Sequence, residues 1–302
     1  MKITKAIAVY LFAVVLLSGL LAPWVFWAVQ EAGRQSPGAS WLLKIPFRRV
    51  FDRTILVVAV AGLWPLCRRL GIRSWGEIGF SRTPRWWRHL LIGVLVGLGS
   101  FLAAGGLLIF FDVRRIDPGF RVQAFLARIP GFMLTAIVVA LIEETFFRGG
   151  LQGVFQRGMK PLAAIAVTSV IYSAVHFLKP PAAGIAADTV RWSSGFDHLV
   201  RVMMQFGRSR EVGLGFVTLW LVGAILGLAF AKTRALYLSI GLHSGWVLTK
   251  QSYGFCTLPV IAQGAAWWGG SDLVSNALIW PVLIVVLLLV NWICGPKPDP
   301  RR

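Results

Sequence analysis

The chain has 302 residues, of which 57% are hydrophobic and only 14% charged, and its mean hydropathy is +0.71. A soluble domain carries about 25% charged residues, so the composition excludes an ordinary soluble protein and predicts a polytopic membrane protein. The net charge of +19 would suggest nucleic acid in a soluble chain. Here the Lys and Arg residues cluster between apolar runs, so we expect no nucleic-acid partner and contact with anionic lipid headgroups.

The apolar runs predict an all-α membrane fold of about eight transmembrane helices around a polar cavity, forming one integral membrane domain over residues 1–302. The first run is longer than the core of a signal peptide and is interpreted as an uncleaved span. Residues 192–206 are predicted to form an amphipathic surface helix. The predicted spans cover residues 6–29, 54–67, 89–111, 129–155, 162–178, 212–231, 235–248 and 276–293. The second is short, and an earlier start within residues 41–51 is the alternative.

The basic residues favour a cell (inner) membrane protein with both termini in the cytoplasm. Lys and Arg divide equally between the two sides of the membrane, but the segments on the side of the N-terminus are shorter and denser in charge. Short, charge-dense segments dominate topology. The three cysteines show no paired spacing, so neither a disulfide framework nor a thiolate metal site is expected.

The predicted span 129–155 contains Glu143, Glu144 and Arg148. An ionised side chain at the bilayer centre costs about 2.5–3.5 kcal/mol, so such residues usually face a protein interior or a watery cavity and carry function. Glu144 and Arg148 are four residues apart and can pair on one helix face. Glu143 points about 100° away and has no charged neighbour on its helix, which leaves it available for chemistry.

His176 and His243 lie in two further apolar spans, where a histidine needs a partner. His198 lies in the long loop after residue 178 and is predicted to be solvated. A shared polar cavity for Glu143, His176 and His243 is the economical interpretation. Two chemistries fit this set: Glu143 acts as a general base on water with the histidines assisting, or the three residues bind zinc, which activates the water. Either one predicts hydrolysis of a bond brought into the membrane.

Three short patterns in this order resemble the CAAX prenyl endopeptidase and bacteriocin-processing (Abi) family of intramembrane proteases. The resemblance covers roughly residues 129–249, and residues 77–82 resemble a segment often found upstream of it. The patterns are Glu143-Glu144-x-x-x-Arg148, Tyr172-x-x-x-His176 and, in a later span, His243.

The resemblance implies an eight-helix core, a membrane-embedded cavity and a glutamate-activated water. Glu143 matches the activating glutamate, His176 its partner and His243 the later histidine of the family. Glu144 and Arg148 match the remaining positions of the first pattern, and their pairing gives them a structural role. The resemblance does not decide between a metal-free site and a metalloprotease with Glu143, His176 and His243 as ligands.

The chain departs from the family pattern at two positions. Tyr172 stands where the second pattern usually has Phe, which keeps an aromatic ring one turn from His176. Val247 stands where the third pattern usually has Asn and cannot donate a hydrogen bond. If the usual Asn helps to form the oxyanion hole, this protein needs another donor, because loss of one oxyanion donor lowers a rate by about 100–1000-fold. The nearby candidates are Ser244, Trp246 and Thr249.

The favoured hypothesis is an intramembrane endopeptidase that cleaves a protein or peptide substrate near its C-terminus or within its membrane segment. A non-catalytic scaffold or immunity protein of the same fold is the first alternative. A transporter that uses Glu and His as a proton or metal relay is the second. Repeated halves, which many transporters show, are not evident in the sequence.

Overall fold

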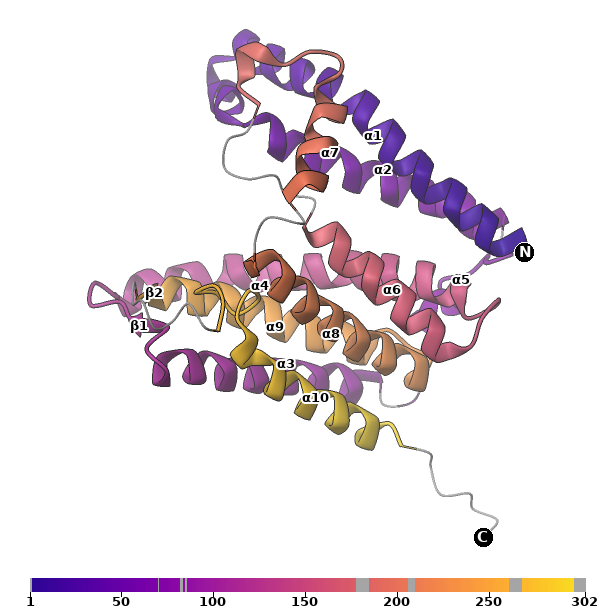
Figure 1. Cartoon of the computed structure of the whole chain (residues 1–302), viewed down its shortest axis with the longest axis vertical. Helices are drawn as coiled ribbons and strands as arrows, with labels where there is room; N and C mark the ends of the chain where they lie inside the picture. Colours follow the sequence, from indigo (N-terminus) through magenta and orange to yellow (C-terminus); the bar gives the residue numbers. More distant parts are fainter. Residues whose placement is uncertain are drawn as a thin grey trace. The chain divides into compact units, whose positions relative to one another are not determined.

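The computed structural model describes residues 2–69, 71–81, 84, 86–177, 185–205, 210–260 and 268–295. Over these residues the fold is helical, as predicted, apart from one two-stranded ribbon (Figure 1). Backbone contacts divide the chain into two compact units. The first comprises Met1–Ile72 with Ala174–Ser209, and the second comprises Arg73–Ser173 with Arg210–Arg302. The expectation of a single membrane domain remains a prediction.

The first unit is built on two long antiparallel helices, α1 (Lys2–Gln35) and α2 (Phe47–Arg69), joined by the 3₁₀-helix η1 (Pro37–Lys44). Near the connection, the rings of Phe26 and Phe47 meet edge to face at 5.6 Å. Toward the other end, the Tyr10 hydroxyl donates a 2.6 Å hydrogen bond to the Ala59 carbonyl. These two contacts fix the antiparallel pairing. Both helices extend beyond the predicted spans 6–29 and 54–67.

Helix α7 (Ser194–Gln205) completes the first unit, after the short 3₁₀-helix η4 (Ala187–Thr189), and its bounds agree with the predicted amphipathic helix. It packs closely on α1, where a Cβ atom added to Gly195 would strike the Gly19 backbone. The prediction of a solvated His198 is wrong. This side chain is 1% exposed and its ring lies 4.3 Å from that of Phe51 on α2, because the apolar face of α7 turns inward.

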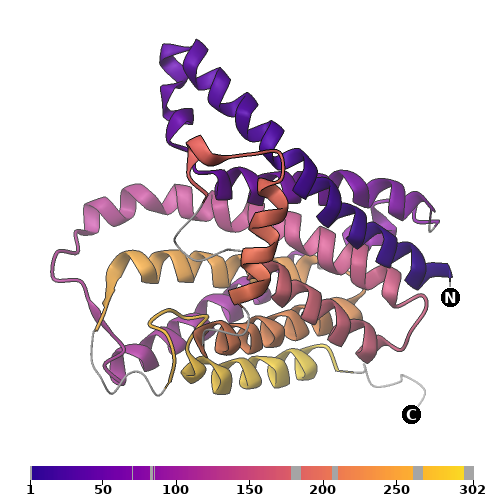
Figure 2. The same ribbon diagram turned by 45° about the horizontal axis from the view of Figure 1, so that its top comes forward.

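The second unit places α9 between α3 and α4, with α8 against α9 and α10 against α8 (Figures 1 and 2). The unit boundary falls inside α6, after Ser173. The elements that begin in this unit are η2 (Gly76–Phe80), α3 (Trp86–Phe110), β1 (Arg114–Ile116), α4 (Val122–Glu144), η3 (Thr145–Gln152), α5 (Gly153–Phe155), α6 (Pro161–His176), α8 (Arg210–Thr233), α9 (Tyr237–Cys256), β2 (Thr257–Pro259), η6 (Ala277–Ile279) and α10 (Trp280–Ile293).

Helices α3 and α9 touch backbone to backbone through two pairs of glycines, each pair four residues apart. Gly93 and Gly97 on α3 face Gly241 and Gly245 on α9. A Cβ atom on Gly245 would lie 2.7 Å from the Val94 carbonyl oxygen and 2.9 Å from the Gly97 Cα. Small residues permit this approach, which supplies dense van der Waals contact where lipid offers no hydrophobic driving force. The contact fixes the height and rotation of α9.

Strands β1 and β2 pair antiparallel and connect the end of α3 to the end of α9. The buried Arg114 secures this ribbon. Its guanidinium donates to the Thr257 hydroxyl and carbonyl and to the Ser271 carbonyl, and stacks over the Tyr253 ring. Helix α9 continues to Cys256, beyond the end of the predicted span 235–248, and a strand follows. Residues 261–267 lie outside the described residues.

Among the described residues, five helices can cross a membrane by length and composition, as expected of an integral membrane protein. They are Lys5–Gln35, Phe47–Arg69, Trp86–Phe110, Val122–Phe155 and Arg210–Thr233. The other three predicted spans also coincide with helices, since Pro161–His176 and Ala277–Ile293 are shorter apolar helices and α9 covers 237–256. The count of eight spans is not confirmed and remains a prediction. On α4, the exposed Leu134, Ile137 and Leu141 form an apolar outer face suited to lipid.

Candidate active site

The predicted pattern Glu143-Glu144-x-x-x-Arg148 lies where the α-helix α4 gives way to a π-helix. Glu143 and Glu144 end α4, and the chain continues as the wider π-helical turns of η3. All residues from Phe147 to Gln152 are buried. π-helical turns are rare and occur frequently at functional sites, because the extra residue per turn redirects side chains.

Glu144 and Arg148 form the buried ion pair expected from their spacing. Both residues are 0% exposed, and Glu144 Oε2 lies 3.4 Å from Arg148 Nε. The guanidinium also donates to the Gly223 carbonyl at 3.3 Å and stacks over the ring of Tyr172, 4.6 Å from its centroid. Tyr172 therefore contributes a π face to the arginine, in addition to its place one turn before His176.

Gln152 is a site-supporting residue that the sequence reasoning missed. It lies one turn after Arg148, is fully buried and donates a 2.8 Å hydrogen bond from Nε2 to the Gly227 carbonyl. Arg148 and Gln152 thus bind two carbonyls of α8, at Gly223 and Gly227, where no side chain blocks access. The signal that could have found it is the polar residue on the same face, four positions after Arg148.

His243 joins the two glutamates from the opposite helix. Its Nδ1 lies 2.8 Å from Glu144 Oε1, and its Nε2 lies 3.8 Å from Glu143 Oε2. Glu144 is an acceptor, so the hydrogen-bond network assigns the Nδ1 proton to a bond with Glu144 and directs Nε2 toward Glu143. A carboxylate that holds one ring nitrogen in this way fixes both the tautomer and the ring orientation.

The two adjacent carboxylates have different environments. The Glu144 side chain is 0% exposed and bound by two basic groups, whereas the Glu143 side chain keeps 22% exposure. The buried Tyr172 hydroxyl is within interaction range of Glu143. Glu143 is therefore the carboxylate that a substrate or water can reach. Glu144 has a structural role, since its carboxylate is buried between Arg148 and His243.

His176 lies in the last turn of α6, four residues after Tyr172 and on the same face of the helix. The unit boundary precedes it. The pairing of His176 with Glu143 therefore remains a prediction.

The oxyanion donors considered near Val247 are not equally available. The Trp246 indole donates to the Ser100 hydroxyl at 2.9 Å, and the Thr249 hydroxyl donates to the Gly245 carbonyl at 2.9 Å. Both groups are thus used for helix packing. Of the three candidates, Ser244 is the one whose side chain makes no hydrogen bond to another described residue.

The described residues contain no preformed set of metal ligands. No group of three or more His, Cys, Asp or Glu side chains there is arranged to hold an ion. His243 uses Nδ1 on Glu144, which leaves Nε2 and the Glu143 carboxylate facing each other. Metal binding by Glu143, His176 and His243 remains a prediction.

In the upstream segment 77–82, of which residue 82 lies outside the described residues, the acidic residue Glu77 is held by several hydrogen bonds. The Glu77 carboxylate accepts hydrogen bonds from the backbone N–H groups of Arg73 and Ser74 and from the Ser74 hydroxyl. It also pairs with Arg157 at 3.5 Å. The Arg73 N–H contributes most, followed by the Ser74 hydroxyl, and together these groups lower the pKa of Glu77 below its ordinary value.

Ile78 contacts η3 at Gly149, and Gly79 contacts the turn before α9 at Leu236. A Cβ atom on Gly149 would lie 2.5 Å from the Ile78 carbonyl oxygen, so the two backbones touch. Gly79 has a φ of +100° and packs against Phe230 and Leu236. Its carbonyl accepts a 3.0 Å hydrogen bond from the Leu236 N–H. The segment therefore connects η3 to the turn between α8 and α9.

These features define a helical integral membrane protein with a buried carboxylate–histidine centre. The family model for the type II CAAX prenyl endopeptidases, Rce1-like, matches residues 124–249. The match confirms the resemblance drawn from the three patterns and includes Glu143, Tyr172, His176 and His243. It spans less than half of the chain, and the activity that it indicates is that of an intramembrane protease. A comparison with curated proteins gives no match.

Proposed function

We propose that this protein is an intramembrane endopeptidase that hydrolyses a peptide bond near the C-terminus, or within the membrane segment, of a protein or peptide substrate. The observation that carries the proposal is the arrangement of Glu143 and His243: a partly exposed carboxylate facing an imidazole whose other nitrogen is held by Glu144. The family match over residues 124–249 supports the reaction class.

The arrangement suits activation of water. With the Nδ1 proton bound to Glu144, the Nε2 lone pair of His243 and the Glu143 carboxylate are both acceptors. Their atoms are 3.8 Å apart, beyond direct hydrogen-bond distance. One water can donate an O–H to each, which leaves its oxygen lone pair to attack a substrate carbonyl. Positioning of this kind, with the protein groups already fixed, supplies much of an enzymatic rate.

In the proposed reaction, Glu143 takes a proton from this water as the oxygen bonds to the peptide carbonyl carbon. The carbonyl oxygen becomes an oxyanion, and His176 is the proposed donor that stabilises it. Glu143 then gives its proton to the amide nitrogen as the C–N bond breaks. The products are a carboxylic acid and an amine, and Glu143 returns to its carboxylate form. If a metal binds, it would supply Lewis acidity at this water.

Proteolysis in reconstituted vesicles tests the proposal. A panel of hydrophobic C-terminal peptides is incubated with the wild type, with Glu143→Gln and with Glu31→Gln, which changes an exposed glutamate on α1. We expect cleavage by the wild type and Glu31→Gln and a loss of at least about 100-fold in Glu143→Gln. Cleavage that survives Glu143→Gln refutes the assignment, and a chelator arm separates metal-dependent from metal-free cleavage.

The scaffold hypothesis is distinguished in cells. If a phenotype of the deleted protein is rescued equally by the wild type and by Glu143→Gln, a non-catalytic role is indicated. We further propose a cell-membrane location with cytoplasmic termini, supported by the dense basic segments on that side. Protease protection of tags at both ends in sealed vesicles tests this orientation.

A further inference from the structure

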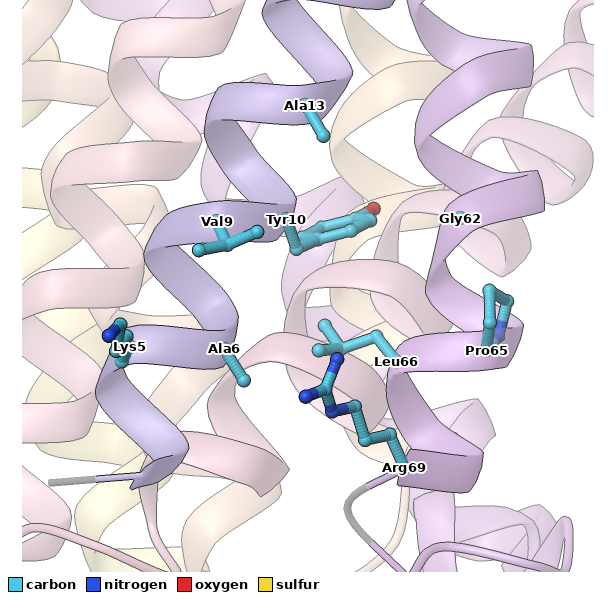
Figure 3. A pocket seen from close by; sticks show the side chains of 9 residues that line it. All are labelled: Lys5, Ala6, Val9, Tyr10, Ala13, Gly62, Pro65, Leu66 and Arg69. Carbon is cyan, nitrogen blue, oxygen red and sulfur yellow. The ribbon is translucent and has the colours of Figure 1, made fainter.

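A cavity of about 710 Å³ lies between α1 and α2, within the first unit and distinct from the residues of the candidate active site (Figure 3). Its size is within the range of small-molecule sites in proteins. Tyr10 crosses from α1 toward α2, while Leu66 and Arg69 point from α2 toward α1. The nine residues that line it are Lys5, Ala6, Val9, Tyr10, Ala13, Gly62, Pro65, Leu66 and Arg69.

The cavity exists because small residues occupy positions where two packed helices usually place large ones. Ala6 and Ala13 on α1 and Gly62 on α2 contribute almost no side-chain volume. The Tyr10 ring is held in place by its hydrogen bond to Ala59 and by contact with Gly62, where an added Cβ would lie 3.0 Å from the ring. The result is a space lined mainly by apolar side chains, between two helices that are long and apolar enough to cross a membrane.

The charge in the cavity is confined to one end. Among the described lining residues, the two cations are Lys5, near the start of α1, and Arg69, at the end of α2, and both are exposed. Because the helices are antiparallel, these residues lie at the same edge of the membrane. None of the described lining residues is acidic. The space thus combines an apolar interior with a positive mouth at the level of the headgroups.

We propose that this cavity binds one anionic phospholipid, with an acyl chain between α1 and α2 and the phosphate at Lys5 and Arg69. Arg and Lys are the side chains that bind phosphate, Arg through paired N–H donors. A free phosphate ion would leave the apolar wall uncovered, and the Tyr10 hydroxyl there already donates to the Ala59 carbonyl. A lipid satisfies both ends at once and reaches the cavity by lateral diffusion.

Lipid titration with native mass spectrometry of the full chain tests the proposal. The protein is purified in a neutral detergent, delipidated, and titrated with phosphatidylglycerol or with phosphatidylcholine of the same acyl chains. Each basic residue near a membrane surface changes anionic lipid affinity by about five-fold. We therefore expect the wild type to retain phosphatidylglycerol preferentially, and the double variant Lys5→Gln, Arg69→Gln to bind it about 25-fold more weakly.

Two further variants test the basic residues at the mouth and the apolar interior of the cavity separately. Arg53→Gln removes an exposed positive charge from α2 outside the cavity and should retain lipid as the wild type does. Ala13→Leu fills the apolar part and should weaken binding of both lipids while leaving the charges intact. A matching elution profile in size-exclusion chromatography shows that each variant is folded.

Three outcomes would overturn the proposal: equal affinity for the two lipids, equal lipid binding by the wild type and the double variant, or displacement of the lipid by millimolar inorganic phosphate alone. The readout does not depend on proteolysis, so this result and the fate of the proposed function are independent.

Discussion

Replacing Glu144 with Gln changes one carboxylate of an adjacent pair, and the structure predicts that the two substitutions differ in their effect on stability. Glu144 is 0% exposed and lies 3.4 Å from Arg148 and 2.8 Å from His243. Glu143 is 22% exposed, and its Oε2 lies 3.8 Å from His243 Nε2. The two substitutions, Glu144→Gln and Glu143→Gln, are identical in volume and chemistry.

The expected loss for Glu144→Gln follows from the charge it leaves behind. Arg148 remains buried without its carboxylate, and breaking a buried ion pair in this way costs about 3–5 kcal/mol. At roughly 2–4 °C per kcal/mol, the unfolding temperature should fall by about 10 °C. Peptide cleavage should also fall by about 10–100-fold, because His243 loses the carboxylate that orients it. For Glu143→Gln, the change in stability should stay below about 1 kcal/mol, while cleavage is lost.

Thermal unfolding in detergent, measured beside the cleavage assay, checks this contrast. The double variant Glu144→Gln, Arg148→Met is the control, since removing both partners of a buried pair is often nearly neutral. It should recover most of the stability and none of the activity. Equal unfolding temperatures for Glu143→Gln and Glu144→Gln, or a double variant less stable than Glu144→Gln, would refute the reasoning.

Two other predictions concern the framework of the site. Gly245→Leu should destabilise the protein by at least about 1–3 kcal/mol and abolish cleavage, because any side chain at this position collides with the α3 backbone. The matched control for the unfolding temperature is Gly99→Leu, since Gly99 on α3 faces open space. The lowered pKa of Glu77 means that its contribution to stability is present above the ordinary value of 4.5 and is lost as the pH falls through the lowered pKa. Protection of the Arg73 and Ser74 amides against hydrogen exchange, relative to the intrinsic rate at each pH, should therefore fall at low pH in the wild type. In Glu77→Gln this protection should be low, with little pH dependence.

The sequence alone determined the class of protein and the residues of interest. Apolar length is a local property, so each predicted span coincides with a helix. An ionised side chain within such a run is conspicuous for the same reason, and this singled out Glu143, Glu144 and Arg148. The i,i+4 spacing predicted the Glu144–Arg148 pair because helix geometry alone sets that distance. The order of the three patterns carried the family resemblance.

Only the tertiary structure decided how the two glutamates divide their roles. Glu144 is shared between Arg148 on its own helix and His243, 99 positions further along the chain, and no local pattern encodes that contact. The burial of His198 was decided in the same way, by the face that α7 turns toward α2. The position of His243 depends on glycines of α3 and α9 that meet across about 150 residues of sequence. Such contacts arise from close packing between distant segments, which local periodicity does not record.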